Sequence, residues 1–159
     1  MISLQKLIDC LPQQGSVEWI GIRPARKAPL ESVGQVEIKM DHGLVGDHYS
    51  KSGGKRQVTL IQAEHLDAVA SMLGIDSVNP EDVRRNIVVR GINLLALKDK
   101  HFGVGDVTLA FTGLCHPCSR METVLGPGGY NAMRGHGGIT ARVLHGGRIK
   151  LGDSVGVIA

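Results

Sequence analysis

Residues 113–122 read Gly-Leu-Cys-His-Pro-Cys-Ser-Arg-Met-Glu, and they join two segments of different character. The apolar segment before them, 107–111, has the composition of a strand, whereas 119–125 has that of a helix. Pro117 restricts the backbone between the two, because its ring fixes φ. The stretch therefore predicts a strand that runs into a helix, with two cysteines at the corner.

The start of the predicted helix bears on the chemistry of Cys118. Ser119 and Glu122 have the S-x-x-E spacing of a capping box, in which each side chain accepts a hydrogen bond from a free backbone N–H group. Cys118 would then directly precede the first helical turn, at the positive end of the helix dipole and two residues from Arg120. Both influences favour a thiolate over a thiol, so this position predicts a good nucleophile or metal ligand.

Short apolar segments separated by turn residues predict strands in the rest of the chain. The predicted strands are 17–23, 33–40, 57–61, 87–89, 107–111, 139–144, 148–151 and 155–158. We expect 139–144 and 148–151 to form a hairpin across Gly146-Gly147, and 102–106 to be a turn. This series of short strands indicates a mostly β fold with a few short helices, and it favours a mostly antiparallel barrel or sandwich.

Helical periodicity occurs in two further segments. Residues 62–73 place apolar side chains on one face and are followed by Gly74, which is typical of a helix end. Residues 1–11 have a similar spacing and are followed by Pro12, so they predict a short N-terminal helix. We therefore expect a helical extension over 1–16 and a single β-barrel domain over 17–159.

The composition of the 159-residue chain limits its functional class. Hydrophobic residues make up 42% but aromatic residues only 3%, so the core is expected to consist of Val, Leu and Ile. The net charge of +3 is too small for a nucleic-acid-binding surface and fits a phosphate-bearing small ligand better. No apolar stretch approaches about 18 residues, which predicts no membrane span. Three cysteines and no leader-like start predict a reduced, cytoplasmic protein.

The Cys115-x-x-Cys118 spacing is compatible with several chemistries. The pair could be a redox dithiol, or half of a zinc site completed by His136 and His145. Alternatively, one thiol is reactive and the other is a bystander, or both cysteines merely pack. The position of Cys118 at a predicted helix start favours a reactive thiol over simple packing.

Two basic stretches are candidate anion sites. Arg84-Arg85-Asn86 precedes a short apolar strand and can aim a guanidinium and an amide at a phosphate or a heterocycle, although a solvated charge pair is an equal alternative. Residues 134–138 read Arg-Gly-His-Gly-Gly, in which the glycines allow backbone N–H groups to form an anion-binding nest beside Arg134. A flexible turn is the alternative there.

The glycine-rich segment 41–56 is expected to be a long loop. Within it, Asp47-His48 has the residue types of a general acid–base pair, but a loop aspartate more often holds the neighbouring backbone. Residues 52–56 lack the spacing of a phosphate-binding loop, so a nucleoside triphosphate site is excluded there.

Taken in order, several motifs resemble those of the MOSC domain, a family named for the C-terminal domain of molybdenum cofactor sulfurase. The resemblance covers the chain from about residue 17 onward and is that of a stand-alone, bacterial-type member. Several members carry an acidic residue where Arg85 stands here. The motifs are Gly46-Asp47-His48, Gln62-Ala63-Glu64-His65-Leu66, Arg84-x-Asn86-Ile87-x-Val89, Gly105-Asp106, Pro117-Cys118, and the tail from Gly138-Ile139 to Gly152-Asp153-Ser154-Val155.

The resemblance implies a β-barrel and a single cysteine, here Cys118, that binds molybdenum or carries sulfur as a persulfide. Relatives reduce N-hydroxylated compounds, such as amidoximes and hydroxylamino-purines, at a molybdopterin-bound molybdenum, with electrons from a separate reductase. On this basis we expect Cys118 to be the catalytic metal ligand, with the pterin and its phosphate held by Arg84, Asn86, Arg120 and Arg134. The alternative is a sulfur carrier that receives sulfur from a donor protein and holds a Cys118 persulfide.

Overall fold

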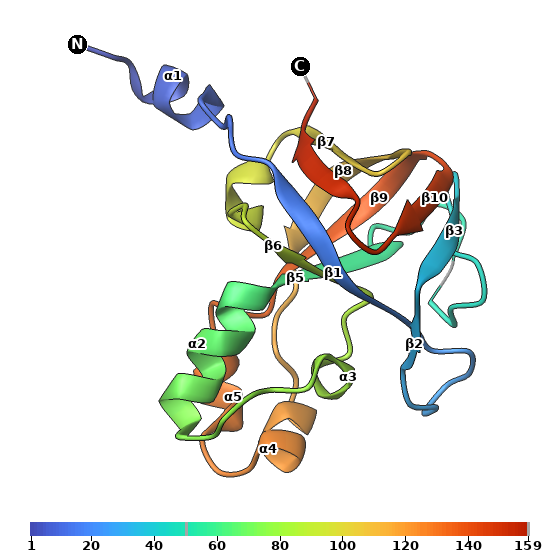
Figure 1. Cartoon of the computed structure of the whole chain (residues 1–159), viewed down its shortest axis with the longest axis vertical. Coiled ribbons are helices and arrows are strands. Elements are labelled where there is room, and N and C mark those ends of the chain that lie inside the picture. Colours follow the sequence, from blue (N-terminus) through green and yellow to red (C-terminus); the bar gives the residue numbers. More distant parts are fainter. Residues whose placement is uncertain (50, 159) are drawn as a thin grey trace.

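The computed structural model describes residues 1–49 and 51–158, and the predicted mostly β fold is confirmed (Figure 1). The strands are β1 Gly15–Ile22, β2 Glu31–Val33, β3 Gln35–Lys39, β4 Gly43–Leu44, β5 Val58–Gln62, β6 Ile87–Arg90, β7 His101–Val104, β8 Val107–Leu114, β9 Ile139–His145, β10 Gly147–Lys150 and β11 Ser154–Val157. The helices are α1 Leu4–Asp9, α2 Ala63–Leu73, α3 Pro80–Val83, α4 Arg120–Leu125 and α5 Gly129–Met133, with a 3-10 turn, η1, at Leu94–Leu97.

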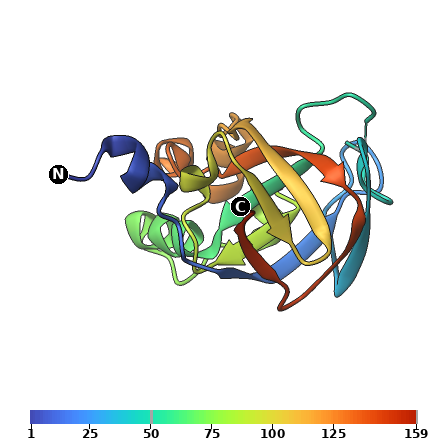
Figure 2. The ribbon, with the colours of Figure 1, turned by 90° about the horizontal axis from the view of Figure 1, so that it is seen from above.

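Seven strands of the described chain close into a barrel, in the order β1-β11-β7-β8-β9-β5-β6 and back to β1 (Figure 2). Closure depends on β1, which pairs with β11 at its start and with β6 further along. The pairings of the barrel are antiparallel apart from that of β5 with β6, which α2 and α3 connect. Strands β10, β3 and β4 form a smaller sheet. The predicted barrel is thus confirmed.

Two layers of apolar, mostly aliphatic side chains surround the central strands, as the composition predicts. The inner layer fills the barrel and includes Ile20, Leu60, Ile87, Phe102 and Leu109. The outer layer lies between the barrel and α2 and α5, and includes Ile61, Leu66, Val69, Val88 and Met133. Because β5 is covered on both faces, all five of its residues are buried. Each such aliphatic side chain contributes roughly 1.5–3 kcal/mol to stability.

The helices are not distributed evenly around the barrel. Figure 1 shows α2, α3, α4 and α5 gathered at one end of it, whereas α1 stands apart near the N-terminus and buries none of its residues. The boundary between an extension and the barrel domain stays a prediction. Over the described residues, every helix is too short or too polar to cross a membrane.

The predicted hairpin between 139–144 and 148–151 is wrong. Strand β9 pairs with β5 and β8, whereas β10 pairs with β3 in the smaller sheet. A Cβ added at Gly146 would lie 2.6 Å from the carbonyl oxygen of Ile38. The two glycines therefore allow a close passage of the chain from the barrel to the smaller sheet, instead of a two-residue hairpin turn.

The predicted turn at 102–106 is also longer than the observed one. Residues 101–104 form β7, which pairs with both β8 and β11, so the turn is confined to Gly105-Asp106. Helix α5 was not predicted, since its five residues are too few to show a helical period.

Gly138 allows a close contact that a side chain would prevent, and this gives a stability prediction. Its φ is 86°, and an added Cβ would overlap the carbonyl oxygen of Leu60 on β5. Gly138→Ala should lower the free energy of unfolding by about 2–4 kcal/mol in denaturant titration, through steric overlap and left-handed strain. Gly34→Ala is the control, because an added Cβ there has no neighbour within 4 Å. Similar stabilities of the two variants would contradict this account.

Candidate functional site

Cys118 lies at the corner between β8 and α4, so the predicted order of strand, cysteine pair and helix is confirmed. Its side chain is exposed, whereas that of Cys115 is only 3% exposed. The Cys118 carbonyl oxygen accepts a hydrogen bond from Met121 N at the start of α4. The two cysteines therefore have different surroundings, and Cys118 is the one that solutes can reach.

The predicted capping box is wrong. The Ser119 side chain makes no capping hydrogen bond, and the Glu122 carboxylate accepts from the backbone N–H groups of Gly128 at 2.9 Å and Tyr130 at 3.0 Å. These two bonds lower the pKa of Glu122. Because α5 begins directly after α4, its free N–H groups compete for the same carboxylate. Glu122 thus connects the two helices and does not cap α4.

A cleft with an excess of positive charge opens beside Cys118. We call it the arginine cleft, and its inner part, about 170 Å³, is lined by Cys118, His116 and Tyr49 together with arginines. Its outer part, about 230 Å³, extends past Pro29 and Val124 and is also lined by Glu81 and Asp82. The cationic side chains that line the two parts are Arg23, Lys27, Arg56, Arg84, Arg85 and Arg120. Within the described residues, none of these six is paired with a carboxylate.

Arg23 lies where the two parts of the arginine cleft meet. It was not among the residues predicted from the sequence. It follows β1, lines both parts of the cleft, and is only 4% exposed. Its Nη1 is buried without a hydrogen-bond partner, while its guanidinium lies 4.7 Å from the ring centre of Tyr49. A buried guanidinium with an unused donor is costly unless an anion completes its contacts. The signal in the sequence was an arginine placed directly after an apolar strand.

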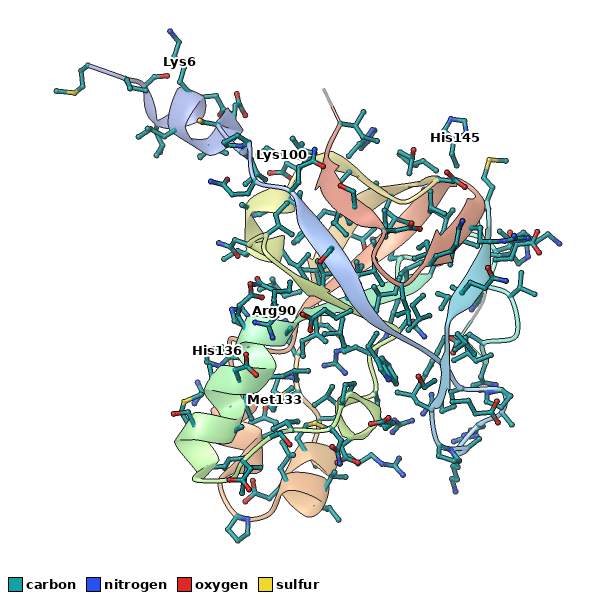
Figure 3. The ribbon with its side chains drawn as sticks, viewed as in Figure 1. Lys6, Arg90, Lys100, Met133, His136 and His145 are labelled. Atoms are coloured by element: carbon teal, nitrogen blue, oxygen red, sulfur yellow. The ribbon has the colours of Figure 1, made fainter. Side chains whose placement is uncertain are left out.

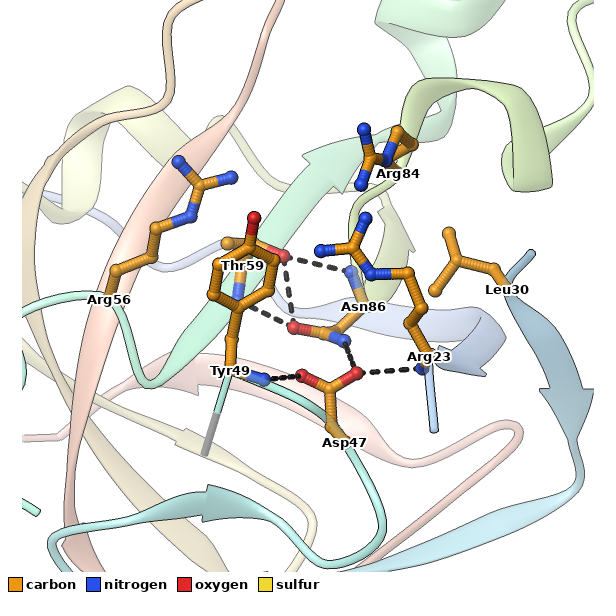
Figure 4. A pocket seen from close by; sticks show the side chains of 8 residues that line it. All are labelled: Arg23, Leu30, Asp47, Tyr49, Arg56, Thr59, Arg84 and Asn86. Carbon is orange, nitrogen blue, oxygen red and sulfur yellow. Dashed lines mark hydrogen bonds between the residues drawn. The ribbon is translucent and has the colours of Figure 1, made fainter. Parts of the chain in front are cut away.

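The backbone that carries Arg23 is held by a buried network (Figure 4). Asp47 accepts hydrogen bonds from the backbone N–H groups of Arg23 at 2.8 Å and Tyr49 at 3.2 Å, and from the Asn86 amide at 3.3 Å. Asn86 also donates to the carbonyl oxygen of Gly21 and accepts from Thr59. Asp47 therefore does what loop aspartates most often do, which is to hold the neighbouring backbone.

Asn86 was predicted to hold a pterin, which stays a prediction, and its side chain is engaged by partners within the chain. Both its amide nitrogen and its oxygen are committed to partners within the chain. Asn86 is only 7% exposed, and it lines a small pocket together with Arg23 and Arg84 beside the cleft. Its contribution is to position Asp47 and thereby the backbone of Arg23.

Arg84 and Arg85 are adjacent in the sequence, but their side chains have different surroundings. Arg84 ends α3 in the left-handed conformation, with a φ of 63°, and lines both parts of the arginine cleft. Arg85 is buried and donates to the carbonyl oxygens of Val83 and Gly137, each at 2.8 Å, and of His116 at 3.5 Å. Burial lowers the pKa of the Arg85 guanidinium, while the nearby thiols of Cys115 and Cys118 raise it. Arg85 is therefore not a solvated charge, whereas Arg84 is half-buried and has no carboxylate partner among the described residues.

Of the two remaining predicted cofactor ligands, Arg120 lines the cleft and Arg134 does not. Arg120 lines the outer part of the cleft with Lys27. Arg134 is exposed, bonds to Asn131 at 3.4 Å, and is not among the residues that line the cleft. In the segment 134–138, an added Cβ at Gly137 would overlap the Cys115 carbonyl oxygen, so this glycine allows the segment to pass against the cysteine corner.

The zinc alternative lacks its ligands. Among the described residues, no group of three or more His, Cys, Asp or Glu side chains is arranged to hold a metal ion. His136 packs against His65 instead, and His145 is exposed at the end of β9. The cysteine pair therefore does not belong to a four-ligand structural zinc site of the usual kind.

Comparisons with known proteins agree with this fold. A family model described as the MOSC domain matches residues 45–156, while no curated protein sequence gives a significant match. The solved structure of the YuaD protein from Bacillus subtilis is 18% identical, with a TM-score of 0.79 over 92% of this chain and 97% of that one. YiiM from Escherichia coli is 16% identical, with a TM-score of 0.68 over 91% and 70% of the two chains. YiiM from Geobacillus stearothermophilus is 18% identical, with a TM-score of 0.69 over 93% and 76%.

The Asn86 network can be tested without any ligand. Asn86→Ala removes buried hydrogen bonds to Thr59, Gly21 and Asp47 at once, so the ligand-free protein should lose about 2–4 kcal/mol of unfolding free energy. Thermal and denaturant unfolding measure this loss. Arg134→Ala, which removes an exposed side chain, is the control and should have little effect. If Asn86→Ala is as stable as the wild type, Asn86 acts through a ligand and not through the fold.

Proposed function

The chain belongs to the MOSC domain family, and from this premise we propose that it is a molybdenum-cofactor-dependent oxidoreductase that reduces N-hydroxylated compounds. In this proposal Cys118 is the metal ligand, and the arginine cleft holds the pterin and its phosphate. A separate reductase supplies the electrons. The substrate is a small molecule that reaches Cys118 through the inner part of the cleft.

The observation that carries this proposal is the buried, unpartnered guanidinium of Arg23 in the cleft that Cys118 lines. An anionic ligand would complete the contacts of Arg23, and an exposed thiol offers a soft metal a ligand that it prefers. The donor set of this chain therefore fits a group that combines a phosphate with a molybdenum atom. The two requirements are met in adjoining parts of one cleft.

The proposed roles divide between the two parts of the arginine cleft. In the outer part Arg84, Arg120 and Lys27 hold the phosphate, together with Arg23. In the inner part Cys118 binds the metal. Asn86 acts through Asp47 and does not contact the pterin in this assignment. Arg134 contributes only if the segment 134–138 moves toward the cleft.

The reaction takes up two electrons and two protons, breaks an N–O bond and releases water, so that an N-hydroxyl group becomes an N–H group. When bound, the molybdenum cofactor supplies the two-electron redox chemistry for this step. The residues of this chain bind and orient the reactants. Tyr49 and Arg56 line the inner part of the cleft, with 5.5 Å between the Arg56 guanidinium and the Tyr49 ring centre, and in this proposal they contact the substrate.

A sulfur carrier is the second candidate, and the exposure of Cys118 favours it. A persulfide on an exposed sulfur can be transferred directly to an acceptor, and the surrounding arginines stabilise its negative charge. The described cysteines, Cys10, Cys115 and Cys118, are all free. This agrees with the reducing cytoplasm that we propose as the location for either function.

The role of Cys118 separates the single-thiol proposals from a shared dithiol. In protein purified from a host that makes the cofactor, Cys118→Ser should reduce molybdenum content, or cyanide-labile sulfur in the carrier case, at least about tenfold, because a hydroxyl is neither a soft ligand nor a sulfur acceptor. Cys115→Ser should retain most of either. Stoichiometric metal through gel filtration favours the enzyme, and metal-free protein with labile sulfur favours the carrier. Equal loss in both variants would refute the single-thiol assignment.

Arg23 gives a test that distinguishes a binding role from a structural one. Arg23→Met should weaken cofactor binding by about 1.5–3 kcal/mol, as expected for lost charge-assisted hydrogen bonds, and leave the stability of the ligand-free protein unchanged or higher. Arg84→Ala should weaken binding to a similar degree, with partial rescue in Arg84→Lys, which lacks the planar fork. Arg134→Ala is the matched control outside the cleft. Unchanged cofactor affinity in Arg23→Met and Arg84→Ala would remove both residues from the site.

A further inference from the structure

A second cavity lies near the cysteine corner and shares no lining residue with the arginine cleft. Its volume is about 340 Å³, and it is formed by the ends of β5 and β8, the start of α2, the turn η1 and the segment 135–139. We call it the histidine cavity, because His65 and His136 both line it; Figure 3 labels His136 beside α2. Cavities of this size hold small organic molecules.

Two amides, those of Gln62 and Asn93, are among the polar groups that line this cavity. The Gln62 oxygen accepts a hydrogen bond from Leu94 N at 2.9 Å, and the Asn93 oxygen accepts from Leu95 N at 3.2 Å. Each amide oxygen is thus used to start η1. The Asn93 NH₂ group has no partner among the described hydrogen bonds, whereas a hydrogen bond from the Gln62 side chain helps to lower the pKa of the neighbouring Glu64 carboxylate. The Asn93 amide therefore offers a ligand two donors and no free acceptor of equal strength.

The two imidazoles add donors that depend on protonation. His136 Nδ1 lies 2.9 Å from the carbonyl oxygen of Ala132, which only accepts, so Nδ1 carries the hydrogen. The His136 ring meets His65 edge to face, with 5.0 Å between ring centres, and His65 Nδ1 is buried without a partner. Burial and His136 lower the pKa of His65, and Glu64, the nearby carboxylate, raises it. A bound anion would favour a proton on either ring.

The rest of the cavity is apolar and partly open to solvent. Leu95 is 53% exposed and Leu114 is 50% exposed, although both are large aliphatic side chains. Covering them would remove apolar surface from water at a gain of roughly 25 cal/mol per Å². The cavity therefore combines a group of hydrogen-bond donors with an aliphatic wall.

We propose that the histidine cavity binds a small organic acid. The carboxylate accepts hydrogen bonds from the Asn93 amide and from a protonated imidazole, while its apolar tail covers Leu95 and Leu114. This site is independent of the proposed function, because it uses neither Cys118 nor the cationic side chains of the arginine cleft. A neutral ligand of the same shape lacks the charge that the donors favour.

The test compares matched probes on the full-length chain by calorimetry or NMR titration. Hexanoate represents an aliphatic acid and benzoate an aromatic one, and each should bind at least about tenfold more tightly than its neutral amide, with hexylamine weaker still. Affinity for the acids should be higher at pH 6 than at pH 8, because imidazole protonation adds donors at the lower pH. No binding of either acid at about 10 mM, or equal binding of acid and amide, would overturn the proposal.

Two isosteric variants place a negative charge on the wall of the cavity. Gln62→Glu and Asn93→Asp keep the oxygen that accepts from Leu94 or Leu95 and replace the NH₂ group by a charged oxygen. Each should weaken acid binding at least about tenfold. Gln35→Glu, an exposed strand residue in the smaller sheet, is the charge control and should bind normally. Normal acid binding by both cavity variants contradicts the proposal, and if either variant unfolds, the probe comparison on the wild type decides.

Discussion

The Asn86 side chain joins two strands and a loop at the point where the candidate site begins. Its nitrogen donates to Gly21 on β1 and to Asp47 in the loop after β4, and its oxygen accepts from Thr59 on β5. A buried polar network of this kind is stabilising only when every member is satisfied, and then it fixes a unique geometry. Because Asp47 also holds the backbone of Arg23, the position of the central cation of the cleft depends on an amide directly before β6. The network that joins β1 and β5 of the barrel therefore also positions the cleft.

The cysteine corner is fixed by a second buried cation, Arg85. Its guanidinium bonds to carbonyl oxygens of α3, of the segment that contains Gly137, and of His116 within the corner. The three carbonyl acceptors take one hydrogen bond from each guanidinium nitrogen but leave the charge uncompensated, and two thiols lie near that charge. On the other side of the corner, Leu114 and Gly138 line the histidine cavity. The segment around Cys115 and the segment around Gly137 pass against each other. Together they form one wall of the arginine cleft and one wall of the histidine cavity, which differ in chemistry.

The parts of this structure that depend on local sequence could be predicted, and the parts that depend on distant partners could not. The strand and helix on either side of Cys118 follow from apolar periodicity, as does α2. Gly146-Gly147 has the sequence of a hairpin turn, yet the partner of β10 is β3, over 100 residues earlier. Glu122 has the spacing of a capping box, but a helix that the sequence did not reveal takes its carboxylate. Arg23 was missed because its burial depends on the loop that carries Tyr49.

The contrast between Arg23 and Arg134 shows why burial is a better guide to a ligand site than charge alone. An exposed guanidinium such as Arg134 is hydrated, so an anion that binds it must displace water and gains little. Arg23 has already lost much of its water on folding, and its Nη1 has no replacement partner. The cost of that desolvation is carried by the free protein and is recovered when an anion binds. Ligand occupancy and fold stability are therefore linked through this one side chain, and a ligand that contacts Arg23 should stabilise the fold by an amount that rises with the logarithm of its concentration relative to its Kd.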